Sequence, residues 1–178
     1  MNLSKYSSSD SETIEKLFTK VFSDSEGESE GLLIGKLTHD LISGTNPKDI
    51  YGFVAIEKGQ IIGSIFFSRL RFESEDNVFI LAPVAIHTDY QGQGIGQKLI
   101  TFGINHLREN GVDLVFTYGD PNFYKKVGFR PIPEKVAKPP FELKYPHGWL
   151  CQSLSGSEIE PITGNSYCVE ALNHPEYW

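Results

Sequence analysis

Two apolar runs joined by a glycine-rich segment and an amphipathic stretch restrict the fold more than any other feature of the chain. The first run, "ILAPVAI" (residues 80–86), is followed by glycines at alternate positions 92, 94 and 96, and the second run is "LVFTYG" (114–119). Between them, apolar residues recur with helical spacing: Leu99, Ile100, Ile104 and Leu107. Residues 98–111 are therefore predicted to form a helix that joins two strands, with Gly111 as its C-cap. A helical crossover of this kind makes its two strands parallel neighbours, so we expect one parallel pair at the centre of the sheet.

Two helices are expected before the sheet. The first begins with a capping-box pattern, Ser9-x-x-Glu12, and its apolar face consists of Ile14, Leu17, Phe18 and Val21. An acidic stretch with small residues then predicts a loop; its carboxylates are Asp24, Glu26, Glu28 and Glu30. The second helix is expected to be amphipathic, to run through Leu32, Leu33, Leu37 and Leu41, and to end near Gly44. The acidic stretch is either a solvated loop or a surface that attracts a cationic acceptor.

Residues 51–87 read as three antiparallel strands, with turns at Lys58 and Gly59 and at 73–77. A short helix is expected at 121–129, with Pro121 near its first position. Residues 141–154 resemble a strand, and the last twenty or so residues carry no clear signal. The order of elements predicts an α+β fold in which the sheet is mostly antiparallel, with a single parallel step.

Composition limits the partners. The chain has 178 residues, which suits one domain spanning 1–178, and its 16 Lys and Arg against 23 Asp and Glu give a net charge of −7. This acidic balance argues against nucleic acid and favours a cationic or basic acceptor. No apolar run reaches the length of a membrane span, and the N-terminus lacks the apolar centre of a signal peptide. Because the two cysteines make neither a disulfide framework nor a metal-binding spacing, we expect a cytoplasmic protein. We also expect a monomer or homodimer that binds no membrane.

The glycine loop, residues 91–96 ("QGQGIG"), has the composition of an anion site. Glycines before a helix expose backbone N–H groups, and the N-terminal end of a helix favours phosphate. The alternative is a tight strand-to-helix turn that needs left-handed backbone at two positions. The P-loop pattern and the dinucleotide pattern Gly-x-Gly-x-x-Gly both require glycine at the position of Gln97, so neither fits.

The loop does match a third pattern, Gln/Arg-x-x-Gly-x-Gly/Ala. Together with "GDPNFYKKVGF" (119–129), the stretch "LAPVAIHTDYQGQGIGQKLI" resembles the core of the GNAT superfamily of N-acetyltransferases over about residues 80–131. The resemblance implies a twisted, mostly antiparallel sheet with a central splayed parallel pair and helices on both faces. It also implies acetyl-CoA as acetyl donor, with no metal. Backbone contacts to its pyrophosphate would come from Gln91, Gly92, Gln93, Gly94, Ile95 and Gly96, and contacts to its pantetheine arm from Pro83, Val84, Ala85 and Ile86.

Pro83 lacks a ladder donor, so a splay or bulge is expected at that point of the strand. Two positions depart from the commoner form of the family, which has Asn and Ala where this chain has Thr117 and Asp120. The family resemblance therefore leaves open whether Asn122 makes a coenzyme contact in their place.

The family places a tyrosine near the coenzyme sulfur, and here the position is that of Tyr124, the candidate general acid for the leaving thiolate. Its structural alternative is packing on a short helix. The base is open: residues 77–86 contain no carboxylate, His87 and Asp120 are the nearest titratable groups, and a water relay is the leading alternative. Asp120 is equally suited to cap the short helix.

The sequence predicts an enzyme that transfers the acetyl group of acetyl-CoA to a primary amine by direct attack in a ternary complex. A covalent route is disfavoured because Cys151 and Cys168 lie outside the motif. The acceptor, a small molecule or a peptide, is not identified, and residues 132–178 are a candidate wall of its site. The alternative is a non-catalytic acyl-CoA-binding or sensor module.

Overall fold

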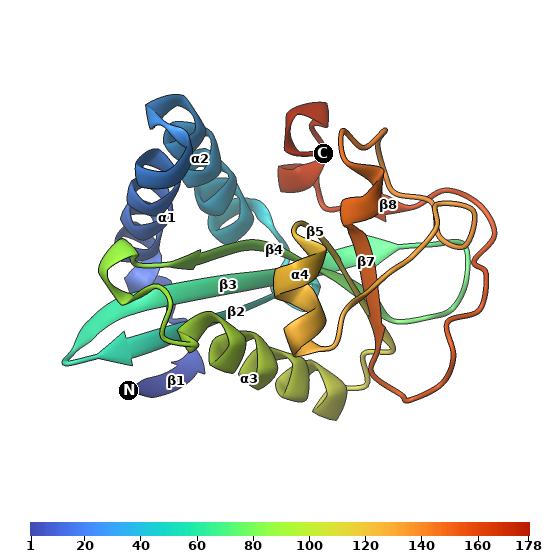
Figure 1. Cartoon of the computed structure of the whole chain (residues 1–178), viewed down its shortest axis with the longest axis horizontal. Helices are drawn as coiled ribbons and strands as arrows, with labels where there is room; N and C mark the ends of the chain where they lie inside the picture. The colour runs from blue at the N-terminus through green and yellow to red at the C-terminus, as the bar shows by residue number, and fades with distance from the viewer. The chain divides into compact units, whose positions relative to one another are not determined.

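The computed structural model describes all 178 residues. Its strands form one mixed sheet, and helices pack against it. Four α-helices are formed: α1 (Ser11–Glu26), α2 (Glu28–Gly44), α3 (Ile95–Glu109) and α4 (Pro121–Tyr124). The strands are β1 (Asn2–Lys5), β2 (Ile50–Glu57), β3 (Gln60–Arg71), β4 (Val78–Ile86), β5 (Leu114–Tyr118), β6 (Arg130–Pro131), β7 (Trp149–Ser153) and β8 (Tyr167–Cys168). Figure 1 shows these elements along the chain.

The strand order is β1-β2-β3-β4-β5-β7-β6, and β8 pairs with β3. β4 and β5 are parallel, whereas β5 and β7 are antiparallel. The predicted α+β fold with a parallel step is confirmed. The chain divides into two compact units, one of Met1–Phe67 with Pro83–Gly103 and one of Ser68–Ala82 with Ile104–Trp178.

Helices cover both faces of the strands in the first unit (Figure 1). On one face, Phe66 of β3 contacts Phe18 of α1 and Tyr6. On the other, Phe53 of β2 packs edge-on against Phe67 and against Phe102 of α3. Because successive strand residues point to opposite faces, Phe66 and Phe67 place the two helical layers on opposite sides. The apolar faces predicted for the first and third helices are buried as expected.

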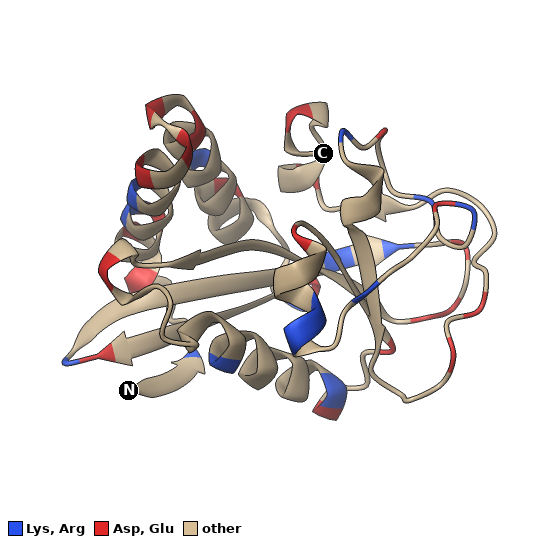
Figure 2. Cartoon of the chain, viewed as in Figure 1, with Lys and Arg blue, Asp and Glu red and all other residues tan.

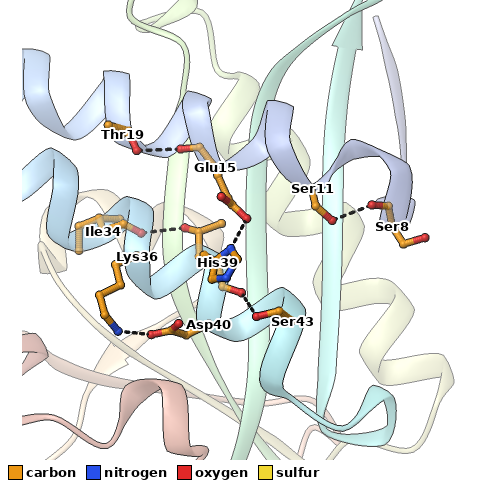
Figure 3. Close-up of polar contacts among 10 residues, drawn as sticks. Ser8, Ser11, Glu15, Thr19, Ile34, Lys36, His39, Asp40 and Ser43 are labelled. Carbon is orange, nitrogen blue, oxygen red and sulfur yellow. Dashed lines mark hydrogen bonds and ion pairs between the residues drawn. The ribbon is translucent and has the colours of Figure 1, made fainter.

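α1 and α2 pack closely because α2 carries glycine at the contact. A Cβ added at Gly31 would lie 2.6 Å from the Thr19 carbonyl oxygen, and one added at Gly35 would overlap the Thr19 side chain. His39 Nδ1 of α2 lies 2.8 Å from Glu15 Oε1 of α1, and this contact joins the two helices in Figure 3. Most other polar contacts in that view, such as Thr19 to the Glu15 carbonyl, are within one helix, whereas Ser11 of α1 donates to the Ser8 carbonyl in the turn before it.

Two local predictions in this region are wrong. The acidic stretch is not a loop: α1 runs to Glu26, α2 starts at Glu28, and only Gly27, with φ +101°, separates them. Acidic residues in the first turn of α2 are stabilised by the positive end of the helix dipole, so an acidic stretch is compatible with the start of a helix there. The capping box is formed by Ser7 and Asp10 rather than by Ser9 and Glu12, and it caps a short 3-10 turn before α1.

In the second unit, β5 lies next to β7, and its core is aromatic. Phe116 stacks on Trp149 with ring centroids 4.9 Å apart, and Trp178 packs against both Trp149 and Tyr118. The indole N–H of Trp178 donates to the Leu172 carbonyl, which fixes the C-terminal segment. The strand predicted over 141–154 is shorter than expected, since regular pairing covers Trp149–Ser153. None of the helices combines the length and apolar character that crossing a membrane requires.

Candidate functional site

The glycine loop lies between β4 and α3 in the first unit. Gly92 and Gly94 have φ of +76° and +78°, in the left-handed region that favours glycine. A Cβ added at either would meet no atom within 4 Å. These two glycines are therefore required by backbone conformation and not by crowding, and they leave bare backbone facing open space. The two left-handed positions expected of a tight turn are present.

Hydrogen bonds fix the loop at both ends. The Gln91 side-chain amide donates to the Ile86 carbonyl at 2.9 Å, and the Lys98 N–H donates to the Gly94 carbonyl at 3.1 Å. Since Lys98 makes the first helical bond, the N–H groups at the start of α3 precede the intrahelical ladder. The Ile95 side chain is only 7% exposed and belongs to the core. What the loop can offer a ligand at Ile95 is thus its backbone N–H, a donor suited to an anion.

The pairing between β4 and β5 stops before β4 ends. The last paired residues are Leu81 and Thr117, whereas β4 continues to Ile86. Pro83, which has no N–H to donate, lies two residues beyond the last pair. β5 itself ends at Tyr118, one residue after the last pair, so the splay or bulge expected at Pro83 stays a prediction. Val84 and Ile86 are half-buried, and Ala85 is buried.

His87 follows β4 and acts as an N-cap. Its N–H donates to the Ile62 carbonyl at 2.7 Å, and its Nδ1 accepts the Asp89 N–H at 3.2 Å. In the neutral ring this bond places the lone pair on Nδ1 and the proton on Nε2. The nitrogen able to take a proton is thus already engaged with the backbone, which does not favour His87 as a general base.

The acidic stretch is partly neutralised within the first unit, where red marks its carboxylates at the tip of α1 and α2 (Figure 2). Asp24 Oδ2 accepts from Lys20 Nζ and from Thr88 Oγ1, each at 2.7 Å. The Lys20 hydrogen bond, then the Thr88 bond, lower the pKa of this carboxyl. Asp24 therefore joins α1 to the turn that precedes the glycine loop, while Glu26 and Glu28 stay exposed.

Tyr124 lies in the second unit at the end of α4. The helix is capped by Asp120, whose Oδ1 accepts the Asn122 N–H at 2.9 Å, so the capping alternative for Asp120 is confirmed. Asn122 itself is exposed. The Tyr124 ring packs edge-on against Phe123 and Phe129. Burial raises the pKa of Tyr124 to about 12, although a hydrogen bond with Thr117 acts in the opposite direction.

The Thr117 contact is the feature that sequence reasoning missed. Thr117 is a fully buried polar residue in the apolar strand β5, and its side-chain hydroxyl donates to the Leu81 carbonyl at 2.8 Å. A hydroxyl between Phe116 and Tyr118 is the signal in the sequence that could have indicated it.

Neither cysteine is a reactive thiol. Burial raises the pKa of Cys151 to about 12 and that of Cys168 to about 11, and both are free of disulfides. The thiolate, which is the nucleophile, is therefore scarce near neutral pH. No three His, Cys, Asp or Glu side chains gather as a metal site.

Comparison with known proteins identifies the family. Residues 48–131 match the family model described as acetyltransferase (GNAT) domain. The uncharacterized N-acetyltransferase YjhQ of Escherichia coli K12 is 32% identical over 168 residues, which covers 91% of this chain and 88% of the relative.

Solved structures agree. The Escherichia coli GNAT family N-acetyltransferase YhbS, crystallised in complex with CoA, matches with a TM-score of 0.83 and 26% identity over 97% of this chain and 92% of that one. A GNAT family acetyltransferase from Brucella melitensis, in complex with acetyl-CoA, shares the fold with a TM-score of 0.75 and 24% identity over 96% of this chain and 97% of that one. Taken with the loop at the start of α3 and the parallel pair β4 and β5, these matches show that the chain belongs to the GNAT family of N-acetyltransferases.

Proposed function

We propose that the chain transfers the acetyl group of acetyl-CoA to a primary amine by direct attack in a ternary complex. The observation that carries the proposal is the glycine loop, whose open left-handed backbone at Gly92 and Gly94 leads into the N-terminus of α3. Such a loop suits the pyrophosphate of coenzyme A. The relative YhbS was solved with CoA, which supports the same donor here. Residues 1–178 are proposed to act as one transferase domain.

The β4 residues beyond the last β5 pair are proposed to receive the pantetheine arm. No β5 residue pairs with the end of β4, which consists of Pro83, Val84, Ala85 and Ile86. The backbone groups on that edge of β4 therefore make no hydrogen bonds to β5. An extended arm with amide groups can add to such an edge in the manner of a further strand. A backbone N–H near Val84 would then suit the oxyanion that forms on the thioester carbonyl.

In the reaction, the amine nitrogen attacks the thioester carbonyl carbon; the new C–N bond forms and the C–S bond breaks. The ammonium nitrogen loses one proton before the attack and a second as the amide forms, and the departing thiolate takes one proton from the Tyr124 hydroxyl, which solvent then reprotonates. The pKa of about 12 keeps this phenol protonated at neutral pH, so it is available as a donor.

The proton on the amine is proposed to leave through water. The β4 segment Val78–Ile86 contains no carboxylate, His87 Nδ1 already accepts the Asp89 N–H, and Asp120 already caps α4. A water relay leaves the hydrogen bonds of His87 and Asp120 intact. His87 and Asp120 remain the two titratable candidates if a side chain does take the proton.

The acceptor is proposed to be a small-molecule or peptide amine, cationic before it reacts. The net charge of −7 and the exposed carboxylates Glu26 and Glu28 favour such a group. The C-terminal residues 132–178 are proposed as a wall of the acceptor site. A cytoplasmic, monomeric or dimeric protein that binds neither nucleic acid nor membrane stays a prediction from composition.

The second candidate function is a non-catalytic acyl-CoA-binding module, which the lack of a β4 carboxylate favours. Calorimetry with acetyl-CoA and NADH, followed by thiol-release assays over a panel of polyamines, amino acids, aminoglycosides and peptides, separates the cases. The proposed enzyme binds acetyl-CoA only and releases thiol with at least one amine. Binding without release by any amine would support the module instead, and selective NADH binding would contradict both.

A further inference from the structure

One carboxylate joins the end of α1 to the turn that precedes the glycine loop. Asp24, in the last turn of α1, accepts a hydrogen bond from Thr88 Oγ1 at 2.7 Å, although the two residues are 64 positions apart in the chain. The same oxygen accepts from Lys20 Nζ, one turn earlier in the helix, also at 2.7 Å. Hydrogen bonds to an ionised acceptor are roughly twice as strong as those between neutral groups, so this is the kind of bond that can hold a turn in place.

The helix that carries Asp24 is a firm anchor for this bond. Phe18 and Val21, which precede Asp24 in α1, are buried in the core. On the α2 side, a Cβ added at Gly31 would lie 2.6 Å from the Thr19 carbonyl oxygen, so the two helices are in close contact near this end. Movement of Asp24 would therefore disturb packed side chains, and the Thr88 end of the bond is the one that is free to respond.

The turn that carries Thr88 leads directly into the glycine loop. Thr88–Tyr90 form a short 3-10 turn, and the Gln91 N–H donates to the Thr88 carbonyl at 3.4 Å. The Gln91 side chain returns to the Ile86 carbonyl at 2.9 Å, at the end of β4. Thr88 thus lies between α1 and the first residue of the loop, and its position determines that of Gln91.

The interior of the loop has few contacts of its own. Gly92 and Gly94 carry no side chains, and an added Cβ at either would meet no atom within 4 Å. Glycine has more backbone freedom than any other residue, so the arrangement of such a loop depends on how its two ends are held. A ligand that fits one arrangement binds more weakly in proportion to the fraction of molecules that adopt it.

We propose that Asp24 and Thr88 are positioning residues for the coenzyme site, because their hydrogen bond holds the turn at 88–90 and with it the arrangement of the glycine loop that binds pyrophosphate. This inference rests on the proposed binding of acetyl-CoA at the loop. Neither side chain contacts the coenzyme in this scheme, and neither takes part in acetyl transfer. The bonds from Lys20 and then Thr88 lower the pKa of Asp24, so the acceptor stays ionised at neutral pH.

The test is calorimetry with acetyl-CoA on two variants of Thr88. Thr88→Val removes the hydroxyl at nearly constant volume, and Thr88→Ser keeps it. Thr88→Val is expected to raise the Kd for acetyl-CoA about fivefold, the size of change that the loss of one hydrogen bond brings, while Thr88→Ser stays within about twofold of the parent. With the panel amine that gives the highest rate, kcat at saturating acetyl-CoA should stay within about twofold in both variants, because the loop is then filled.

Asp24→Ala gives an independent arm in case Thr88→Val fails to fold, and it should also raise the Kd about fivefold. The matched control is Asp40→Ala in α2, which likewise loses a lysine partner at i,i+4 spacing, Lys36, and should keep the parent Kd within about twofold. Adding Asp24→Ala to Thr88→Val should cause no further loss of affinity, because both changes break the same bond.

Hydrogen exchange of the free protein separates positioning from general destabilisation. In Thr88→Val, faster exchange is expected over residues 86–96, while β2 (Ile50–Glu57) keeps the parent rate. Faster exchange in both segments would show a merely structural role and overturn the inference. Parent-like affinity in Thr88→Val, or in Asp24→Ala where the valine variant is unfolded, would also overturn it, as would losses that multiply in the double variant.

Failure of the underlying function is seen separately through Gly94→Glu. If that variant binds acetyl-CoA as the parent does, the loop does not hold the pyrophosphate, and the positioning inference falls with it. If Gly94→Glu loses affinity and Thr88→Val does not, the loop keeps its proposed role and only the positioning inference is overturned.

Discussion

The glycine loop and the surroundings of Tyr124 both depend on glycine, but for opposite reasons. In the loop, Gly92 and Gly94 have positive φ, and an added side chain would meet nothing within 4 Å. At Gly119 the backbone is ordinary, and an added Cβ would be 2.7 Å from the Tyr124 ring. One region keeps space open around its backbone, whereas the other fills the space with a side chain that must be held in place.

This difference separates two kinds of effect. A loop that binds through backbone N–H groups should respond to substitution mainly in coenzyme affinity. A phenol that must deliver one proton depends on where its oxygen lies, so changes around it should appear in kcat.

The largest effect is expected from Gly94→Glu. The substitution forces a non-glycine residue to φ +78° and adds negative charge beside the proposed pyrophosphate site. We expect acetyl-CoA affinity to fall at least about 100-fold, or about 2.7 kcal/mol, in calorimetry. The matched control is Gly59→Glu, at φ +76° with equally open surroundings in the turn between β2 and β3. If both variants bind alike, the loop does not hold the pyrophosphate.

Tyr124→Phe is expected to act on turnover and not on binding. Loss of the proton donor should lower kcat about 100-fold, within the usual range for general acid catalysis, with the KM for acetyl-CoA changed less than about twofold. Steady-state kinetics at saturating acetyl-CoA checks this. Tyr6→Phe, at a tyrosine whose ring packs on Phe66 in the first unit, is the control and should keep the parent rate. An unchanged kcat in Tyr124→Phe would remove the general acid from the mechanism.

The same contrast explains what the sequence could predict. The glycine loop could be predicted because positive φ favours glycine, and glycine stands at positions 92 and 94. Helical spacing likewise identified the buried faces of α1 and α3, and the turn at Lys58 and Gly59 was correct. These features depend on neighbours in the chain.

Features that depend on tertiary contacts were missed. The strand Asn2–Lys5 has only four residues and forms through pairing with β2, so no local sequence pattern predicts it. The acidic stretch was expected to be a loop, yet Gly27 alone turns the chain between two helices. The bond from Thr117 to the Leu81 carbonyl joins two strands; the sequence shows a hydroxyl within an apolar strand but does not show which residue it bonds.

The pH dependence sharpens the role of Tyr124. Burial raises the pKa of its phenol to about 12, so the protonated donor persists above the usual tyrosine value of about 10. The amine acceptor must lose a proton, so kcat/KM for the amine should rise with pH. We expect no descending limb attributable to Tyr124 up to about pH 11, measured as a pH–rate profile. A limb with an apparent pKa near 10 that disappears in Tyr124→Phe would show that the phenol is not shielded.

The smallest effect is expected from the cysteines, whose substitution tests whether a side chain outside both regions carries the acetyl group. With thiol pKa values raised to about 12 and about 11 by burial, Cys151 and Cys168 hold little thiolate at pH 8, about one part in a thousand or less. Cys151→Ala and Cys168→Ala should therefore keep kcat within about twofold, although Cys151→Ala leaves a small cavity in β7 that costs about 1 kcal/mol of stability.

A covalent route would give a different pattern. Direct attack requires both substrates to be bound together, so initial-rate plots against acetyl-CoA at several amine concentrations should intersect. A cysteine intermediate would instead give parallel lines and an acetylated protein when acetyl-CoA is added without amine. Intersecting lines, with no acetyl adduct by mass spectrometry, would leave the loop to bind the donor and Tyr124 to assist the leaving thiolate. Parallel lines together with an adduct on either cysteine would move the chemistry out of both regions.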